Sequence, residues 1–186
     1  MCQVSLLNQM CNIKFRICTT RFNNKTMMEN QMWRLRNNMI GNCVYGLPSL
    51  SPLKELDGVL LVLEMNNDTN RIEGIGVLEN RKIHECSVYD TGNYNRYVFV
   101  GKYRFRIRHT SNKEAYASSD DEAYASIKLT EEEIIVIKML EMALFYGYKH
   151  SKRGRGISIL PKHVYELYDF TTTIKYLCKR VLLMTL

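Results

Sequence analysis

The sequence predicts an α+β domain: a curved, mainly antiparallel β-sheet or partly closed barrel, followed by helices toward the C-terminal end. One observation is a continuous apolar run over residues 59–65, whose length suits a strand buried on both faces. A second is a strand pattern over residues 71–78, directly after an Asn-rich turn, which indicates a hairpin. The third is a capped helix pattern that begins at Thr130. The 186 residues are near the size of one domain and can bury a core.

The first 40 residues differ in composition from the rest of the chain. They are rich in Met, Asn and Cys, and their apolar positions are scattered. Apolar residues between Met27 and Met39 fit one face of a helix. We therefore expect residues 1–40 to form a loosely attached arm or short helix, and residues 41–186 to form a single α+β domain.

The predicted hairpin carries two glycines at related positions. Asn and Asp in the turn at 66–70 tolerate the left-handed backbone that tight turns use. Gly74 and Gly76 fall on the same face of the second strand, so a ring or another backbone is expected to approach there. Crowding within a curved sheet explains this better than a ligand contact, although both interpretations stay open.

The middle of the chain predicts one more strand pair and one loop. The strands are expected over residues 83–89 and 95–108. The sequence Glu-Ala-Tyr-Ala-Ser then occurs twice, within a stretch of small and acidic residues. This composition predicts a mobile acidic loop over residues 114–128.

A strong helix signal follows the loop. Thr130 suits the N-cap, Glu133 stands at the capping-box position, and Gly147 provides a C-terminal stop. Beyond this helix the pattern predicts a strand over residues 157–160 and helices over residues 164–167 and 172–184.

Composition limits the kinds of partner and compartment. The net charge of +7 points to an anionic partner. The six cysteines form no C-x-x-C pair, so a zinc site is not expected, and a reduced intracellular protein fits better than a secreted one. No apolar run approaches the roughly 18 residues that span a membrane, so no membrane partner is expected.

The basic residues are segregated along the chain. Residues 91–113 contain six Lys or Arg and no acid, and residues 142–165 contain five and no acid. Residues 114–133, between them, hold seven acids and one Lys. Such blocks favour a charged binding surface over an evenly solvated one.

The best-defined basic feature is the alternating stretch over residues 102–108. In a strand, its cations share one face and recur about every 7 Å, which resembles the phosphate spacing of a nucleic-acid strand. The aromatic and apolar residues between them then face the core. The cations of this predicted basic strand are Lys102, Arg104, Arg106 and Arg108. A solvated strand face and an acidic protein partner are the alternatives.

A second basic feature is the segment of residues 149–156, here called the Gly/Arg loop. Its glycines permit close approach of the backbone, and its cations suit phosphate contacts. It matches neither a P-loop nor a dinucleotide-binding fingerprint, and a flexible basic loop is the alternative. The candidate phosphate contacts are Lys149, Lys152, Arg153 and Arg155, together with Arg96 elsewhere in the chain.

Two tyrosines near the basic strand are candidate base-stacking platforms. Tyr94 and Tyr97 lie among the cations, and a base can stack on an aromatic ring. Asn93 and Asn95 flank Tyr94, and Asn can read base edges, but capping of the turn after Gly92 is the more typical role.

The sequence predicts no catalytic residues, no resident metal and no cofactor. The four histidines lack the context of a metalloprotease or deaminase motif. One enzymatic alternative is a metal-dependent nuclease, in which Glu64, Asp68 and Glu73 would converge on a divalent ion across the hairpin.

Four segments together resemble a family of uncharacterised proteins of large nucleocytoplasmic DNA viruses of protists. These segments are VYGLPSLSP, LEMNNDTNRIEGIGVLENR, NYNRYVFVGKYR and HSKRGRGISILP, which span residues 44–161. The resemblance implies a viral accessory protein located in the host cytoplasm or nucleus, or in the virion.

The central hairpin is also similar to the core of PUA-like domains, including the EVE and YTH types. The similarity rests on the apolar strand, the Asn-rich turn and the sequence I-x-G-I-G-V. It implies a small curved barrel with flanking helices, and many such domains bind RNA.

These observations together predict a non-enzymatic, nucleic-acid-binding viral accessory protein. The basic strand and the Gly/Arg loop are expected to contact phosphates, with DNA and RNA both open. A structural or packaging role in the virion, carried by contacts with other virion proteins, is the first alternative. The nuclease is the second.

Overall fold

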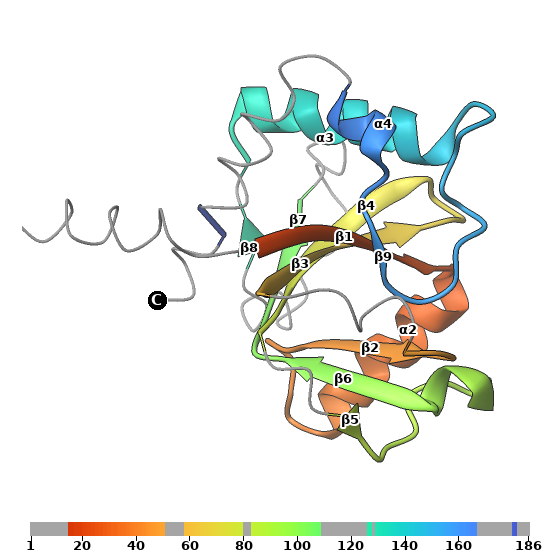
Figure 1. Ribbon diagram of the computed structural model, residues 1–186. Coiled ribbons are helices and arrows are strands. Elements are labelled where there is room, and N and C mark those ends of the chain that lie inside the picture. The colour runs from red at the N-terminus through yellow and green to blue at the C-terminus, as the bar shows by residue number, and fades with distance from the viewer. Residues whose placement is uncertain are drawn as a thin grey trace, which may run out of the picture.

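The computed structural model describes residues 15–50, 58–79, 83–108, 126–127, 129–166 and 180–181. Over these residues the chain folds into two stacked β-sheets with flanking helices. Helices α3 (Glu131–Phe145) and α4 (Lys162–Tyr165) lie over one face of the larger sheet, and the smaller sheet lies over the other (Figure 1). The expected α+β class is confirmed.

The larger sheet, called sheet A, has the strand order β8-β7-β4-β3-β1-β9 within the described residues. Its strands in chain order are β1 (Phe15–Phe22), β3 (Val59–Asn66), β4 (Arg71–Leu78), β7 (Tyr103–Ile107), β8 (Ser126–Ile127) and β9 (Ser158–Ile159). The β3–β4 hairpin is antiparallel, as its apolar run and Asn-rich turn predicted, and Asn70 takes the left-handed backbone with φ 54°.

The smaller sheet, called sheet B, has the order β2-β6-β5 and is antiparallel throughout. Its strands are β2 (Cys43–Leu47), β5 (Ile83–His84) and β6 (Tyr97–Gly101). Of the seven strand pairs in the described residues, only β1–β3 and β7–β8 are parallel, so the pairing is mainly antiparallel. Neither sheet closes on itself in the described part of the chain.

The strand expected over residues 95–108 is two strands in different sheets. The chain leaves β6 in sheet B, bends at Lys102 and enters β7 in sheet A. Gly101 lets the chain pass close to β4 at this corner, because a Cβ there would lie 2.3 Å from the carbonyl oxygen of Val77. This corner turns one face of β7 toward the space between the sheets. Which cations of the predicted basic strand are exposed therefore depends on the corner.

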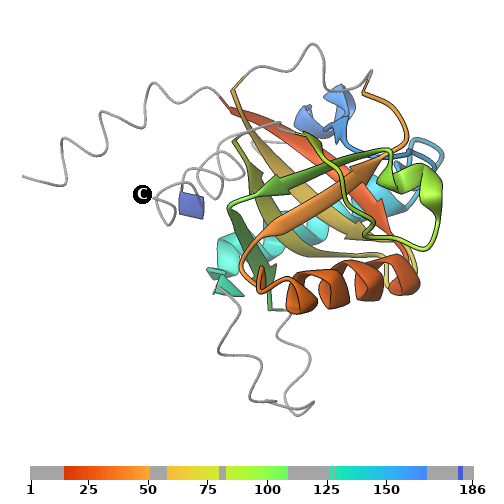
Figure 2. The same ribbon diagram turned by 90° about the horizontal axis from the view of Figure 1, so that it is seen from below.

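Residues 15–36 belong to the core of the fold, so the expectation of a loosely attached N-terminal arm is wrong for them. β1 lies inside sheet A, parallel to β3 and antiparallel to β9, and Ile17 and Cys18 are buried. The helix anticipated in this region is α2 (Asn24–Arg36), capped by Asn23. It runs beside the two sheets (Figure 2) and buries Asn30 and Arg34. The polar composition of the segment concealed a strand whose partners come from distant residues.

Two hydrophobic cores result from this layering. One lies between sheet A and helices α3 and α4, and Leu63, Ile75 and Phe105 are among its buried members. The other lies between the two sheets and includes Tyr45, Val62 and Phe99. Sheet A is therefore covered on both faces, as the continuous apolar run of β3 predicted.

The C-terminal predictions have mixed outcomes. Helix α3 begins at its Thr130–Glu133 capping box and is followed by Gly147 with φ 75°, both as expected. The strand at 157–160 and the helix at 164–167 correspond to β9 and α4. The acidic loop at 114–128 and the helix at 172–184 lie outside the described residues, apart from 126–127 and 180–181. Over the described ranges, no helix has the length and apolarity needed to cross a membrane.

Candidate anion-binding site

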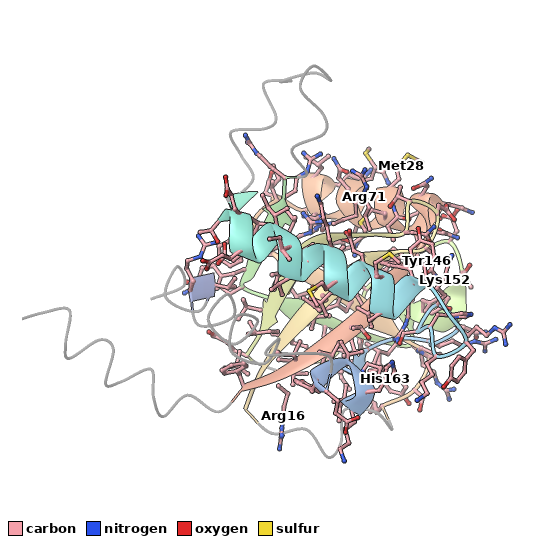
Figure 3. All side chains as sticks on the ribbon, turned by 90° about the horizontal axis from the view of Figure 1, so that it is seen from above. Arg16, Met28, Arg71, Tyr146, Lys152 and His163 are labelled. Atoms are coloured by element: carbon pink, nitrogen blue, oxygen red, sulfur yellow. The ribbon has the colours of Figure 1, made fainter. Side chains whose placement is uncertain are left out.

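A cavity of about 350 Å³ opens at one end of the molecule. Three parts of the chain meet there: the N-terminal end of α2, the 3₁₀ turn η2 (Gly92–Asn95) and the Gly/Arg loop (Figure 2). Figure 3 labels Lys152 of this loop near the C-terminal end of α3. The end of β1 and the β3–β4 turn complete the wall through Arg21 and Asn67.

The wall of the cavity is strongly cationic. Among the described residues that line it, the charged side chains are Arg21, Lys152, Arg153 and Arg155, and none is an Asp or Glu. Four positive groups around one concave space repel one another and create a positive electrostatic potential there, which attracts an anion. Three of the four were predicted phosphate contacts, and Tyr94, also predicted, lies in the same wall.

Arg21 is the residue that sequence reasoning missed. Its Nε donates to the Ser151 carbonyl oxygen and its Nη1 donates to Ser158 Oγ, both at 2.7 Å. Burial lowers the pKa of this guanidinium because desolvation disfavours the charged form. No carboxylate pairs with it in the part of the chain that the structure describes. The sequence signal for this residue was an Arg within a stretch rich in β-branched residues, which is typical of a strand. It was overlooked because residues 1–40 were assigned to an arm.

The Gly/Arg loop is wrapped around Arg21. A Cβ at Gly154 would lie 2.5 Å from Cζ of Arg21, so only glycine lets the backbone sit this close to the guanidinium. Two further bonds tie the loop to the β3–β4 turn. Asn67 Nδ2 donates to the Lys152 carbonyl oxygen at 3.1 Å, and Lys152 Nζ donates to Asn70 Oδ1 at 2.8 Å. The loop is thus held by specific contacts on two sides.

Tyr94 is held in the cavity wall by its neighbour Asn95. Asn95 Oδ1 accepts from the backbone N–H groups of Val88 and Tyr89, and its Nδ2 donates to Ser87 Oγ. This side chain therefore stabilises the turn, and reading of base edges by Asn95 is not supported. The ring of Tyr94 lies edge-on to that of Tyr89, with centroids 6.2 Å apart.

Three other predicted contacts, outside the basic strand, do not line this cavity. Tyr97 is half-buried and packs against the core between the sheets, with Arg96 over its ring at 5.8 Å. Lys149 is exposed and lies over the ring of Tyr148 at 5.5 Å. Stacking on Tyr97 is therefore not supported, while Arg96 and Lys149 remain at the surface.

The predicted basic strand is divided by burial. Lys102, Arg106 and Arg108 are exposed, but Arg104 on the same face is only 7% exposed. Its Nη2 lies 2.6 Å from Oε2 of Glu64, and its Nε donates to the same carboxylate at 2.9 Å. Burial alone would lower the pKa of Arg104, but the Glu64 carboxylate outweighs it and raises the pKa. The assignment of Arg104 to a phosphate is therefore wrong.

Arg106 belongs to a second, smaller cavity of about 100 Å³ between α2 and sheet A. Arg34, Arg104 and Glu73 are also in its wall. Arg106 approaches α2, and Lys102 stands at the corner between the two sheets. The exposed cations of the basic strand therefore lie outside the wall of the larger cavity.

The three carboxylates of the nuclease hypothesis have separate partners. Glu64 pairs with Arg104 and accepts from the Tyr45 hydroxyl at 3.0 Å. Asp68 Oδ2 accepts from the Asn24 backbone N–H, and Glu73 Oε1 accepts from Thr69 Oγ1. Across the described residues, no cluster of three His, Cys, Asp or Glu is arranged to hold a metal ion.

Comparison of the chain with protein-family models, with curated proteins and with solved structures found no match. The functional assignment therefore rests on the geometry of the cavity.

Proposed function

We propose that this protein binds nucleic acid without acting on it chemically, and that phosphates bind at the cavity of the Gly/Arg loop. One observation carries the proposal: in the part of the chain that the structure describes, four cationic side chains and no carboxylate line a single cavity. A buried or half-buried charge costs free energy unless an opposite charge compensates it. A phosphate would provide that compensation for Arg21.

A polyanion fits this surface better than a small anion does. Further cations are exposed elsewhere on the surface, at Arg96, Lys102, Arg106 and Lys149. The chain carries a net charge of +7, so long-range attraction favours a ligand with many phosphates. The similarity of the hairpin to PUA-like domains is consistent with this proposal, as is a role for the protein as a viral accessory factor.

Salt-dependent binding of a labelled oligonucleotide tests the proposal. The double variant Arg153→Gln/Arg155→Gln removes two cations from the cavity wall. If each contacts a phosphate, the slope of log K against log salt should become shallower by about two. Fluorescence anisotropy at several salt concentrations measures this slope.

The matched control is Lys138→Gln/Lys162→Gln, which removes the same charge from exposed positions on α3 and α4. It should retain most of the affinity and slope of the unmodified protein. Equal losses for both double variants would show that only net charge matters and would contradict a site at the cavity. No binding even at low salt would reject nucleic-acid binding and favour the packaging role, in which protein contacts carry the function.

A further inference from the structure

We propose that the cavity receives one unpaired nucleotide of a single strand, with its phosphate at the Arg21 end and its base against Tyr94. This inference rests on the proposed function and names its substrate class: single-stranded rather than duplex nucleic acid. The size of the cavity, the arrangement of its wall and the rigidity of that wall support it.

The cavity has the dimensions of a small-ligand site. Its volume of about 350 Å³ is at the lower end of the roughly 300–1,000 Å³ that such sites occupy. A single nucleotide is a ligand of this size class. A base pair within a duplex is stacked on both sides and joined to two backbones, so it cannot enter a concave space of this size.

The wall offers two kinds of chemistry that one nucleotide combines. The Arg21 end is cationic, while Tyr94 and the edge-on ring of Tyr89 provide an aromatic wall. Neutral polar groups of Thr26, Asn67 and Thr91 also line the cavity. An unpaired nucleotide presents a phosphate, an exposed base face and hydrogen-bonding edges. In a duplex the base faces are covered by neighbouring bases, so the aromatic wall would have no partner.

The Arg21 guanidinium is positioned to meet the phosphate. Its Nε and Nη1 donate to oxygens of Ser151, Gly156 and Ser158, whereas its Nη2 makes no hydrogen bond in the described part of the chain. All its partners are neutral oxygens, so the charge itself is not compensated. A phosphate oxygen would supply both an acceptor and the opposite charge.

The site is largely formed before any ligand arrives. Arg21 fixes the Gly/Arg loop from one side, the β3–β4 turn fixes it from the other, and Asn95 fixes the turn that carries Tyr94. Little backbone ordering is then required on binding, so less free energy of binding is lost to conformational entropy.

Anisotropy with three probes tests the inference: a labelled oligothymidine, a labelled duplex of equal length, and thymidine 5′-monophosphate as competitor. The single strand should bind at least tenfold more tightly than the duplex. The variant Tyr94→Leu should weaken single-strand binding by about 5- to 100-fold and leave duplex binding unchanged. Tyr146→Leu is the matched control, since Tyr146 is half-exposed and outside the cavity wall.

Amide chemical shifts locate the competitor. Thymidine 5′-monophosphate should shift the amide signals of Gly154, Gly156 and Tyr94, while inorganic phosphate should shift only those of the loop. If inorganic phosphate and the nucleotide produce the same shifts, the base has no place in the cavity and the inference fails.

The outcomes separate the inference from the proposed function. Equal binding of single strand and duplex, with no effect of Tyr94→Leu, overturns the inference and leaves nucleic-acid binding intact. Absence of binding to both probes overturns the two together. Preference for the single strand, lost in Tyr94→Leu and kept in Tyr146→Leu, supports both.

Discussion

At the scale of single residues, the pair of Glu64 and Arg104 shows how a strand face can be predicted correctly and its role misjudged. The alternation over residues 102–108 placed Arg104 with the exposed cations, and the structure keeps it on that face. The alternating pattern does not show that another layer of the fold covers the middle of this face. Arg104 therefore neutralises Glu64 in the space between the sheets, and only its neighbours reach solvent.

The first stability prediction concerns this ion pair. Arg104→Met should lower the free energy of unfolding by about 3–5 kcal/mol, because it leaves the Glu64 carboxylate buried without its counter-charge. The double variant Glu64→Leu/Arg104→Met should recover most of that loss, since no charge is then left uncompensated. Urea denaturation of Arg104→Met, Glu64→Leu and the double variant gives the coupling free energy between the two side chains.

The exposed neighbour Arg106 supplies the control, and Arg106→Met should change stability by less than about 0.5 kcal/mol. Losses that simply add in the double variant would show that the pair contributes no mutual stabilisation.

At the scale of elements, the two glycines of strand β4 leave space that neighbouring side chains occupy. Glu64 on β3 lies opposite Gly74, and Arg104 on β7 lies opposite Gly76, so β4 separates the two charged residues. They meet because β4 has no side chain at either position. The Tyr45 hydroxyl also occupies this space, 1.8 Å from where a Cβ of Gly76 would stand. The interpretation of these glycines as relief of crowding, rather than a ligand contact, is therefore confirmed.

Gly76→Ala should accordingly destabilise the protein strongly, by roughly 3 kcal/mol or more. The new methyl group would collide with Tyr45 and with Cβ of Cys43, which lies 2.7 Å from its position. The matched control is Gly92→Ala, because a Cβ at Gly92 would meet no atom within 4 Å. Thermal unfolding followed by circular dichroism compares the two variants, and similar midpoints for both would contradict the crowding argument.

At the scale of the whole molecule, the stacking of the two sheets buries several weak acids together. Burial raises the pKa of Cys43 to about 12 and raises those of Tyr45 and Tyr89 well above their usual range. In the unfolded chain these groups lose their protons at lower pH. Above about pH 9 the unfolded state therefore binds fewer protons than the native state, and stability must fall as the pH rises.

The contribution of these three groups to the free energy of unfolding should be constant below about pH 8 and decline steadily above about pH 9. Tyr89→Phe should reduce the slope of this decline, because one buried acid is removed. Tyr148→Phe, at a side chain that is 92% exposed, should leave the slope unchanged. Urea denaturation at several alkaline pH values measures the slopes, and identical slopes for both variants would contradict the linkage.

The sequence by itself determined those features whose signals are local. The apolar run and Asn-rich turn specified the β3–β4 hairpin, and the Thr130–Glu133 capping box specified the start of α3. The cationic Gly/Arg loop was evident for the same reason, since composition and caps act between residues that are close in the chain.

The tertiary structure alone decided which distant segments meet. It inserted β1 between β3 and β9, covered the face of β7 that carries Arg104, and brought Arg21 and Tyr94 to the Gly/Arg loop. The physical reason is that strand pairing and burial depend on packing between segments far apart in the chain, 40 residues for Glu64 and Arg104 and 130 for Arg21 and Ser151. A period or a cap in the sequence describes one element, whereas the binding cavity is a property of several elements packed together.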